Sequence, residues 1–201
     1  MTDEFIDTFD PEKVRLRTRV FQNEMKEIRT LHAEWFPVSY NDAFYDGLMD
    51  PSTVVTVVAD TTLAEGQTAI LSIATIAINR REKQYNARED LLVALGLDSY
   101  STNIAYILTL GVVDELRRKG LGKRVLEKAI EEVVKRDPYC QIIMLHVIEY
   151  NTSAGKLYRE LGFLEFKIEP NFYFFADQWY NGILFYKKLN RPFKNWYECW
   201  R

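Results

Sequence analysis

The sequence predicts an α/β (α+β) domain with a mixed central sheet of about seven strands and helices on both faces. Its 201 residues are 47% hydrophobic, which is enough to bury one full core. The longest apolar run, residues 69–78, has about half the ~20 residues that a membrane span needs, so it suits a buried strand. After a first hairpin, strand-like and helix-like segments alternate, an order typical of a sheet covered by helices.

The N-terminal third begins with residues 1–12, which are acidic and polar; we expect a flexible lead that is neither a secretory signal nor a transit peptide. Alternating apolar residues in 14–20 predict a first strand, and residues 23–35 predict a helix. A proline interrupts the segment 36–42, and the Asn-Asp pair that ends it can cap a short helix.

The middle of the chain predicts a hairpin followed by an insertion. Residues 52–60 and 69–79 are β-branched runs on either side of a polar, glycine-containing turn, which indicates antiparallel strands. Residues 80–102 are charged and lack a clean period. We expect them to form a long insertion between strands, of the kind that is usually functional or mobile.

The second half of the chain alternates strands and helices. The expected elements are a buried strand at 104–113, a helix ending near residue 136, a core strand at 140–148, a helix at 151–162 and two strands near 163–170 and 181–189. Asn151 can cap the second helix and Gly162 can close it.

Charge and cysteine usage exclude some classes of partner. The formal net charge of −3 offers no general polyanion-binding surface, so we expect no nucleic-acid partner. Cys140 and Cys199 match no metal-ligand spacing, so we expect reduced thiols in an intracellular protein and no bound metal.

Residues 116–130, LRRKGLGKRVLEKAI, gather cations around a helix start, where the macrodipole favours acids. The P-loop pattern fails because Arg117 stands in place of its first glycine, and the dinucleotide fingerprint fails because Val125 replaces its third. What remains is a strand, Arg117-x-x-Gly120-x-Gly122, and a helix. Glycines that allow close approach and free amides at a helix start favour a bound pyrophosphate, which the cations would also attract. A solvated basic surface with a glycine turn is the alternative.

This pattern after a buried strand resembles the R/Q-x-x-G-x-G/A signature of the GNAT superfamily of acetyl-CoA-dependent N-acetyltransferases. The resemblance implies a GNAT fold over residues 13–190 and acetyl-CoA as the cosubstrate, without a metal. Backbone amides of the loop would hold the pyrophosphate, and an amide near the end of the strand would meet the thioester carbonyl. The implied coenzyme-binding residues are Leu110, Gly111, Val112, Arg117, Arg118, Lys119, Gly120, Leu121, Gly122, Lys123, Asn151 and Tyr158.

Other segments are similar to protein N-terminal acetyltransferases of the NatE and NatF types. Residues 36–42 resemble the NatE substrate loop, whereas 105–113 and 144–163 resemble the catalytic and coenzyme strands of both types. The insertion, the hairpin at 169–182 and the tail after it look more like NatF. Ser39 departs from NatF, which carries glutamate there. The resemblance implies that the partners are protein or peptide N-termini.

The predicted chemistry is attack by a neutral amine on a thioester. An α-amino group has a pKa of about 7.7–8.0 and lysine one of about 10.4, so an N-terminus needs roughly 3.5 kcal/mol less help from a base. Tyr106 and His146 are polar residues within apolar strands, and the resemblance implies that they hold a water that takes the amine proton. Tyr158 resembles a tyrosine that faces the departing thiolate. A structural role in the core is the alternative for each of the three.

The resemblance and the aromatic content of two segments predict an apolar slot for the substrate's first residues. A retained methionine followed by a large apolar residue suits such a slot. The predicted lining residues are Phe36, Pro37, Val38, Tyr40, Leu108, Phe172 and Tyr173.

Residues 191–201 place Phe193, Trp196, Tyr197 and Trp200 at helical spacing, which predicts an aromatic amphipathic tail. The resemblance to NatF implies peripheral contact with Golgi or other membranes from the cytoplasmic side; packing onto the chain's own domain is the alternative.

Two other hypotheses stay open for the activity. One is acetylation of lysine side chains, as on histones, and the other is a weakly active adaptor subunit of a larger acetyltransferase complex.

Overall fold

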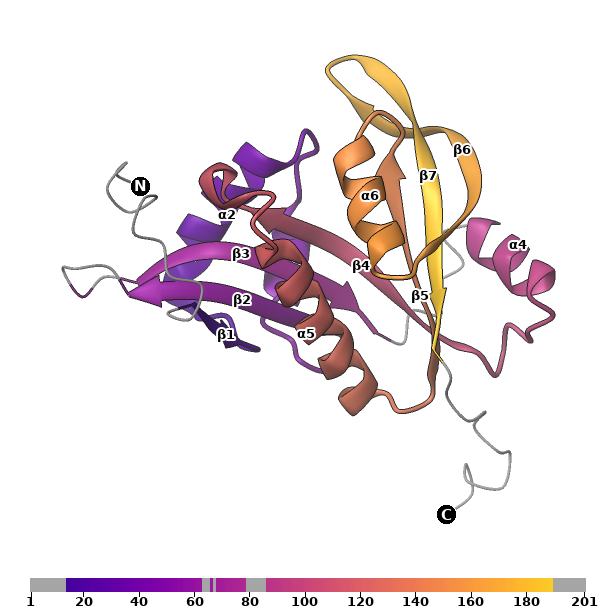
Figure 1. Cartoon of the computed structure of the whole chain (residues 1–201), viewed down its shortest axis with the longest axis horizontal. Coiled ribbons are helices and arrows are strands. Elements are labelled where there is room, and N and C mark those ends of the chain that lie inside the picture. The colour runs from indigo at the N-terminus through magenta and orange to yellow at the C-terminus, as the bar shows by residue number, and fades with distance from the viewer. Residues whose placement is uncertain (1–13, 63–65, 67, 79–85, 190–201) are drawn as a thin grey trace. The chain divides into compact units, whose positions relative to one another are not determined.

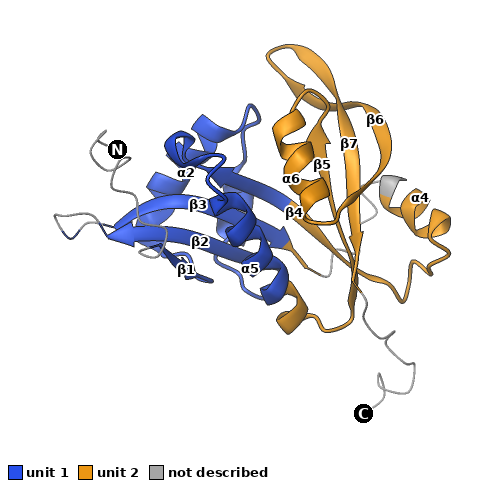
Figure 2. Cartoon of the chain, in the orientation of Figure 1, with its two compact units in different colours: residues 1–76, 108–132 blue, residues 77–107, 133–201 orange. Residues whose placement is uncertain are grey.

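The structure, a computed structural model, describes residues 14–62, 66, 68–78 and 86–189. The predicted N-terminal lead and the aromatic tail lie outside the described residues. The chain divides into two compact units, shown in Figure 2. Unit 1 comprises residues 1–76 and 108–132, and unit 2 comprises residues 77–107 and 133–201.

The elements alternate along the chain as labelled in Figure 1. They are β1 (Arg15–Arg17), the 3₁₀ turn η2 (Gln22–Glu24), α2 (Met25–Trp35), α3 (Asp42–Gly47), β2 (Val54–Thr62), β3 (Thr68–Ala77), α4 (Asn86–Ala94), β4 (Asn103–Val112), η3 (Asp114–Leu116), α5 (Leu121–Arg136), β5 (Cys140–Ile148), α6 (Thr152–Glu160), β6 (Leu164–Phe175) and β7 (Gln178–Lys188). The seven strands pair in the order β1-β2-β3-β4-β5-β7-β6. The β4–β5 pairing is parallel, whereas β5–β7 and β6–β7 are antiparallel, so the predicted mixed sheet is confirmed.

The insertion between β3 and β4 contains regular structure. Residues 80–102, which were predicted to form a long insertion without a clean period, include the helix α4. Leu91 and Leu92 are buried, whereas Asp90 and Val93 beside them are exposed. Only a narrow stripe of this helix is apolar, which is why the sequence shows no clear helical period.

The last two strands are longer than the expected ranges of 163–170 and 181–189, and they form a hairpin over the segment 169–182 that the resemblance marked as one. They pair as far as Phe175 with Gln178. Ala176 and Asp177 between them have φ of 48° and 55° and form a two-residue turn. Turns with two positive φ values match the twist of the flanking strands, although they usually contain asparagine or glycine.

Unit 1 packs α2 and α3 against one face of β2 and β3. Figure 1 shows α5 on the near side of these strands. The shared core between α2, α3 and the strands consists of Val20, Met25, Ile28, Tyr45, Leu48, Val54, Val58, Ile70 and Ile73. On α5, Val125, Leu126 and Ala129 are fully buried and recur at helical spacing, as an amphipathic helix requires.

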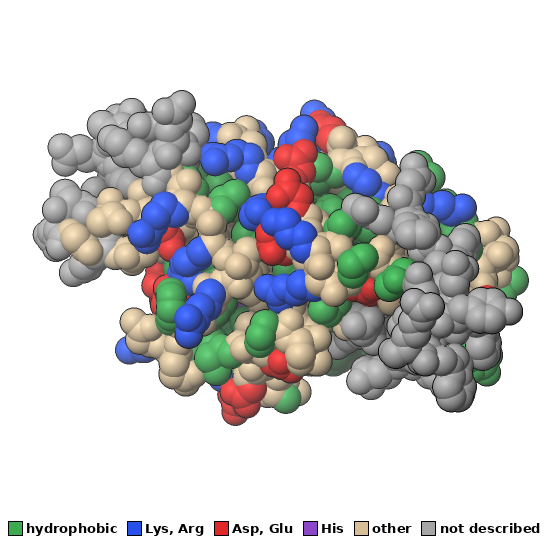
Figure 3. Space-filling model, turned by 90° about the horizontal axis from the view of Figure 1, so that it is seen from below, with side chains coloured by type: hydrophobic (Ala, Val, Ile, Leu, Met, Phe, Trp, Pro, Cys, Tyr) green, Lys and Arg blue, Asp and Glu red, His purple; other side chains and the backbone are tan. Residues whose placement is uncertain are grey.

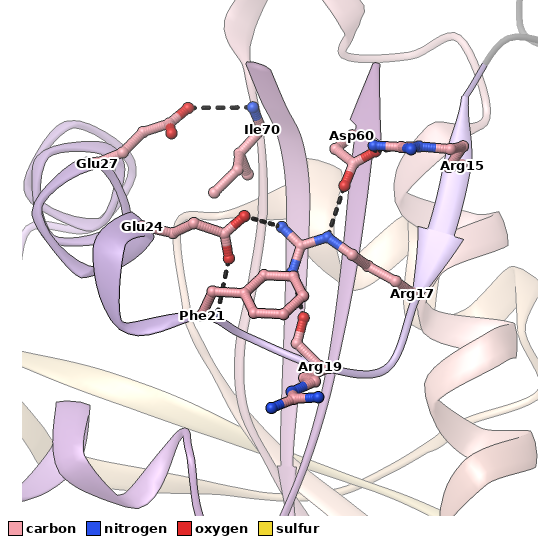
Figure 4. A network of polar contacts seen from close by, with 8 residues as sticks. All are labelled: Arg15, Arg17, Arg19, Phe21, Glu24, Glu27, Asp60 and Ile70. Carbon is pink, nitrogen blue, oxygen red and sulfur yellow. Dashed lines mark hydrogen bonds and ion pairs between the residues drawn. The ribbon is translucent and has the colours of Figure 1, made fainter. Parts of the chain in front are cut away.

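A buried carboxylate ties the edge strand of unit 1 to its neighbour (Figure 4). Asp60 on β2 is 1% exposed and accepts hydrogen bonds from Nε of Arg15 at 2.9 Å and Nε of Arg17 at 2.5 Å. Arg17 also pairs with Glu24, whose carboxylate accepts from the backbone N–H of Phe21 at 2.9 Å. The short strand β1 is therefore held by charged side chains as well as by its backbone ladder.

No helix within the described part of the chain is long and apolar enough to cross a membrane.

Candidate active site

Tyr106 and His146 meet in unit 2. The Tyr106 hydroxyl and Nδ1 of His146 are 2.7 Å apart, and both residues are buried. Tyr106 lies opposite Met144 in the parallel β4–β5 pairing, and His146 stands two residues farther along β5. Side chains two apart on a strand share a face, so the pairing itself brings the phenol and the imidazole together. The structure thus joins the two residues that were predicted to act as the base.

Glu169 of β6 contacts the other ring nitrogen of His146. Its Oε2 is 2.6 Å from Nε2 of the imidazole. Burial lowers the pKa of His146 to about 4, and the hydrogen bond that the ring donates to Glu169 opposes that shift only in part. The imidazole is therefore neutral at pH 7. Because a carboxylate can only accept, Nε2 carries the ring proton and Nδ1 accepts the hydroxyl proton of Tyr106.

Phe172 covers the imidazole from the same strand. Its ring stacks on His146 with centroids 3.8 Å apart and planes 14° apart, and Tyr173 meets Phe172 edge-on at 4.8 Å. A bulge in β6 after Glu169 makes this possible. Asn171 within the bulge has φ of 53° and donates its N–H to Oδ1 of Asn181 at 3.2 Å. Of the two aromatic residues predicted from this hairpin, Phe172 therefore lies on His146 and Tyr173 contacts Phe172.

The predicted pyrophosphate loop lies in unit 1, between η3 and α5. Arg118 and Gly120 have φ of 61° and 82°. An arginine in this left-handed region is strained, and such strain clusters at functional sites. Arg117 braces the turn, since it pairs with Asp114 at 2.7 Å and donates Nε–H to the carbonyl of Val112 at 3.1 Å. The first turn of α5 contains no acidic residue, so the positive end of the helix is not neutralised locally.

The end of β4 is anchored to β3 within the same unit. Ser72 donates its hydroxyl proton to the carbonyl of Gly111 at 2.7 Å, and the N–H of Val113 donates to the carbonyl of Leu71 at 3.0 Å. A β-carbon on Gly111 would lie 1.9 Å from the ring of Trp35, so α2 packs directly on the strand backbone here. The segment predicted to meet a thioester carbonyl is therefore rigidly placed.

The aromatic loop 36–40 follows α2 in unit 1. Phe36 and Tyr40 pack around His32, with ring centroids 5.4 and 5.8 Å from the imidazole. Pro37 is exposed, and three other predicted residues, Val38, Leu108 and Leu110, are half-buried. His32 was not predicted as a notable residue. It is 1% exposed, neither of its ring nitrogens has a hydrogen-bond partner among the described residues, and burial lowers its pKa to about 4.

Comparison with known proteins identifies the family. Residues 25–163 match the model of the acetyltransferase (GNAT) family. The chain belongs to this family. The seven-stranded mixed sheet with helices is the fold that this membership predicts.

Several relatives of this GNAT acetyltransferase are N-terminal acetyltransferases by name. N-alpha-acetyltransferase 60 of Danio rerio is 27% identical over 197 residues, which cover 98% of this chain and 78% of that protein. The Xenopus tropicalis protein of the same name is 29% identical over 154 residues, or 75% of this chain and 60% of its own length. Among solved structures, Arabidopsis thaliana NAA60 with a bisubstrate analogue has a TM-score of 0.75 at 23% identity, covering 89% of this chain and 99% of that one. Arabidopsis thaliana Naa50 has a TM-score of 0.65 at 21% identity, covering 88% and 99%.

Two predicted coenzyme residues of the GNAT chain lie at α6 in unit 2. Asn151 caps this helix, since its Oδ1 accepts the N–H of Ala154 at 3.1 Å. Tyr158 is 5% exposed and packs edge-on against Phe163 at 5.5 Å, with Phe185 at 6.1 Å. This burial raises the pKa of Tyr158 above its usual range. Helix capping and core packing are thus observed for these two residues, and their coenzyme roles stay predictions.

Sequence reasoning missed Glu169 and His32. Glu169 stands in a polar stretch ahead of the aromatic run, and nothing local distinguishes it from its acidic neighbour Glu165. His32 sits on a helix whose periodicity is only rough. Figure 3 shows no histidine among the described residues of the face in view, in keeping with exposed fractions of 1% for His32 and 8% for His146.

Proposed function

We propose that this GNAT acetyltransferase transfers the acetyl group of acetyl-CoA to the α-amine of protein N-termini. The observation that carries the proposal is the 2.7 Å hydrogen bond between Tyr106 and a neutral, buried His146. Such a pair is a weak base. At pH 7.5 roughly a third of α-amines are already neutral, against roughly 0.1% of lysine side chains, so a weak base suits an N-terminus far better.

The named relatives support the same substrate class. The Danio rerio and Xenopus tropicalis proteins are called N-alpha-acetyltransferase 60. Arabidopsis thaliana NAA60 was solved with acetyl-CoA, and Naa50 with the bisubstrate analogue CoA-Ac-MVNAL.

The loop between η3 and α5 suits the coenzyme pyrophosphate. Two left-handed residues, Arg118 and Gly120, turn the backbone, and the uncompensated positive end of α5 follows. Lys119 and Lys123 are exposed and add positive charge. Acetyl-CoA supplies an activated acetyl group as a thioester, and the loop would hold its phosphates.

Tyr106 and His146 would together accept the proton of the attacking amine. The phenol oxygen can accept that proton, directly or through a water, while its own proton passes to Nδ1 of His146. The imidazole does not need to be charged beforehand, because burial keeps His146 neutral at pH 7. Tyr158, whose pKa is raised by burial, keeps its proton at neutral pH and would steady a departing thiolate by donating a hydrogen bond to it.

We also propose a preference for methionine as the first substrate residue. Phe172 stacks on His146, and Tyr173 meets Phe172 edge-on. Aromatic walls favour a flexible apolar side chain such as methionine.

The test uses acetyl-CoA with peptides that begin Met-Leu or Ser-Gly and a third peptide with a blocked N-terminus and an internal lysine. Mass spectrometry should locate the acetyl group on the α-amine of the Met-Leu peptide. Turnover of the lysine peptide alone would favour the lysine acetyltransferase hypothesis. An absence of turnover with every peptide, despite acetyl-CoA binding by calorimetry, would favour an adaptor subunit.

Contact with Golgi or other membranes remains a proposal that rests on the aromatic spacing of residues 191–201, which lie outside the described residues. Flotation of the full chain with vesicles of neutral and anionic lipid tests it. Replacing Trp196 and Trp200 by serine should abolish flotation, and flotation that survives this change would contradict the assignment.

A further inference from the structure

A chain of charged contacts in unit 2 runs from His146 to the insertion helix. Oε2 of Glu169 lies 2.6 Å from Nε2 of the imidazole, and its Oε1 lies 3.1 Å from Nζ of Lys167. The same Nζ donates to Oδ2 of Asp90 on α4 at 2.6 Å. Charges alternate along this chain, so each group holds the next.

We propose that Glu169 is a positioning residue for His146, and that Lys167 and Asp90 keep Glu169 in place, which couples α4 to the acetyl-transfer chemistry. The catalytic half of this inference rests on the proposed function. The structural half, the placement of one proton on the imidazole, does not.

Glu169 decides which nitrogen of His146 carries the proton. A neutral imidazole has a single N–H, and a carboxylate offers only acceptors, so the N–H points to Glu169. Nδ1 then faces Tyr106 as an acceptor. In the opposite tautomer the lone pair of Nε2 would face a carboxylate and Nδ1 could no longer accept the phenol proton.

The same carboxylate would stabilise the product of proton transfer. When the phenol proton moves to Nδ1, His146 becomes an imidazolium whose Nε2 lies 2.6 Å from Glu169. The imidazole side chain is 0% exposed and that of Glu169 is 18% exposed, so water screens this pair poorly. No electrons change hands. After the transfer, Nδ1 of His146 returns its proton to the Tyr106 oxygen, and the phenol releases the proton that it took from the amine to solvent, which restores both neutral groups.

The effect of these charged contacts on His146 weakens toward the surface. Exposed side-chain fractions rise from 18% for Glu169 to 31% for Lys167 and 60% for Asp90. Exposed ion pairs contribute little because water competes for both partners. Glu169 should therefore matter most and Asp90 least. The positive charge of Lys167 also opposes the effect of Glu169 on the pKa of His146, because Lys167 lowers that pKa and Glu169 raises it.

Nitrogen-15 NMR of the histidine rings tests the structural half directly. The sequence has two histidines, and His32→Leu assigns the signals. At pH 7 the wild-type spectrum should show His146 protonated at Nε2 alone. Glu169→Leu should yield a mixture of both tautomers, whereas Glu169→Gln, which keeps an acceptor, should retain the Nε2–H form. An unchanged spectrum in Glu169→Leu would overturn the proposal.

Kinetics test the catalytic half. We expect kcat to fall about 30-fold in Glu169→Leu and about fivefold in Glu169→Gln, with little change in KM for acetyl-CoA. Glu165→Leu is the matched control, because Glu165 lies on the same strand but pairs with Arg159 at the surface. An equal loss of kcat in the control, or none in Glu169→Leu, would contradict the assignment.

Substitutions of Lys167 and Asp90 should lower kcat less than substitutions of Glu169. Lys167→Met should raise the pKa of His146 in an NMR titration and lower kcat about threefold, because Glu169 loses its anchor. Asp90→Asn should lower kcat about twofold, and Glu89→Gln on the same helix should leave it unchanged. Equal values of kcat in Asp90→Asn and Glu89→Gln would show that α4 is not coupled to the chemistry through Asp90. If the wild-type protein acetylates no N-terminus, the proposed function fails, while the NMR result still decides the role of Glu169.

Discussion

Phe172 lies over Gly182, in the space that a side chain at residue 182 would need. A β-carbon on Gly182 would come within 3.0 Å of the Cβ, Cγ and Cδ1 atoms of Phe172. The missing side chain on β7 is therefore what lets the β6 bulge lay an aromatic ring flat on His146. Two residues from different strands thus determine together how the imidazole is covered.

Gly182→Ala should displace the Phe172 ring and weaken peptide binding. We expect KM for a Met-Leu peptide to rise about fivefold, with a loss of roughly 1 kcal/mol in the free energy of unfolding. Gly47→Ala is the control, because a β-carbon there meets nothing within 4 Å. Peptide kinetics and chemical denaturation measure the two effects, and an unchanged KM would show that the Phe172 stack has no part in binding.

Tyr106→Phe should reduce kcat by about 100-fold, because it removes the hydroxyl that exchanges protons with Nδ1 of His146. KM for acetyl-CoA should stay the same. Tyr150→Phe serves as the comparison, since that side chain is 59% exposed. A Tyr106→Phe enzyme with wild-type turnover would exclude the phenol from proton transfer.

Gly111→Ala should destabilise unit 1 strongly. The new β-carbon would lie 1.9 Å from Cε3 of Trp35, so the α2 helix must move, at a cost of roughly 3 kcal/mol. Combining it with Trp35→Leu should recover part of that loss. A double-mutant cycle by denaturation measures the coupling, and purely additive effects would contradict a direct clash.

Stability should fall as the pH falls from about 6.5 to about 4. Burial lowers the pKa of both His32 and His146 from 6.5 to about 4, so within this window the unfolded chain binds more protons than the folded one. Each histidine can contribute roughly 3 kcal/mol to the loss. Thermal unfolding across this pH range measures it.

His32→Leu should remove about half of that acid sensitivity. It should also raise the free energy of unfolding at pH 7 by roughly 1 kcal/mol, since both ring nitrogens of His32 are buried without partners among the described residues. A variant that is less stable at pH 7 would show that these nitrogens do have a partner in solution.

Arg118→Gly should separate backbone strain from charge in the pyrophosphate loop. Glycine accepts the φ of 61° that strains arginine, so the free energy of unfolding should stay the same or rise by up to about 1 kcal/mol. KM for acetyl-CoA should rise about threefold through the lost cation. Lys119→Ala, which removes a cation without a backbone change, should raise KM similarly with no gain in stability.

The sequence by itself determined the local elements. Periodicity and capping predicted β5 at 140–148, the end of α5 near residue 136 and the cap at Asn151, because each depends on neighbours a few residues away. It also marked Tyr106 and His146, since polar groups inside apolar strands need partners.

Only the tertiary structure decided which groups those partners are. Glu169 reaches His146 across 23 residues, and Tyr106 reaches it across 40. Such contacts depend on strand register and on the β6 bulge, which residues of several strands determine jointly, Gly182 among them. No single segment contains that information, so a local pattern can name the candidates for chemistry but cannot pair them.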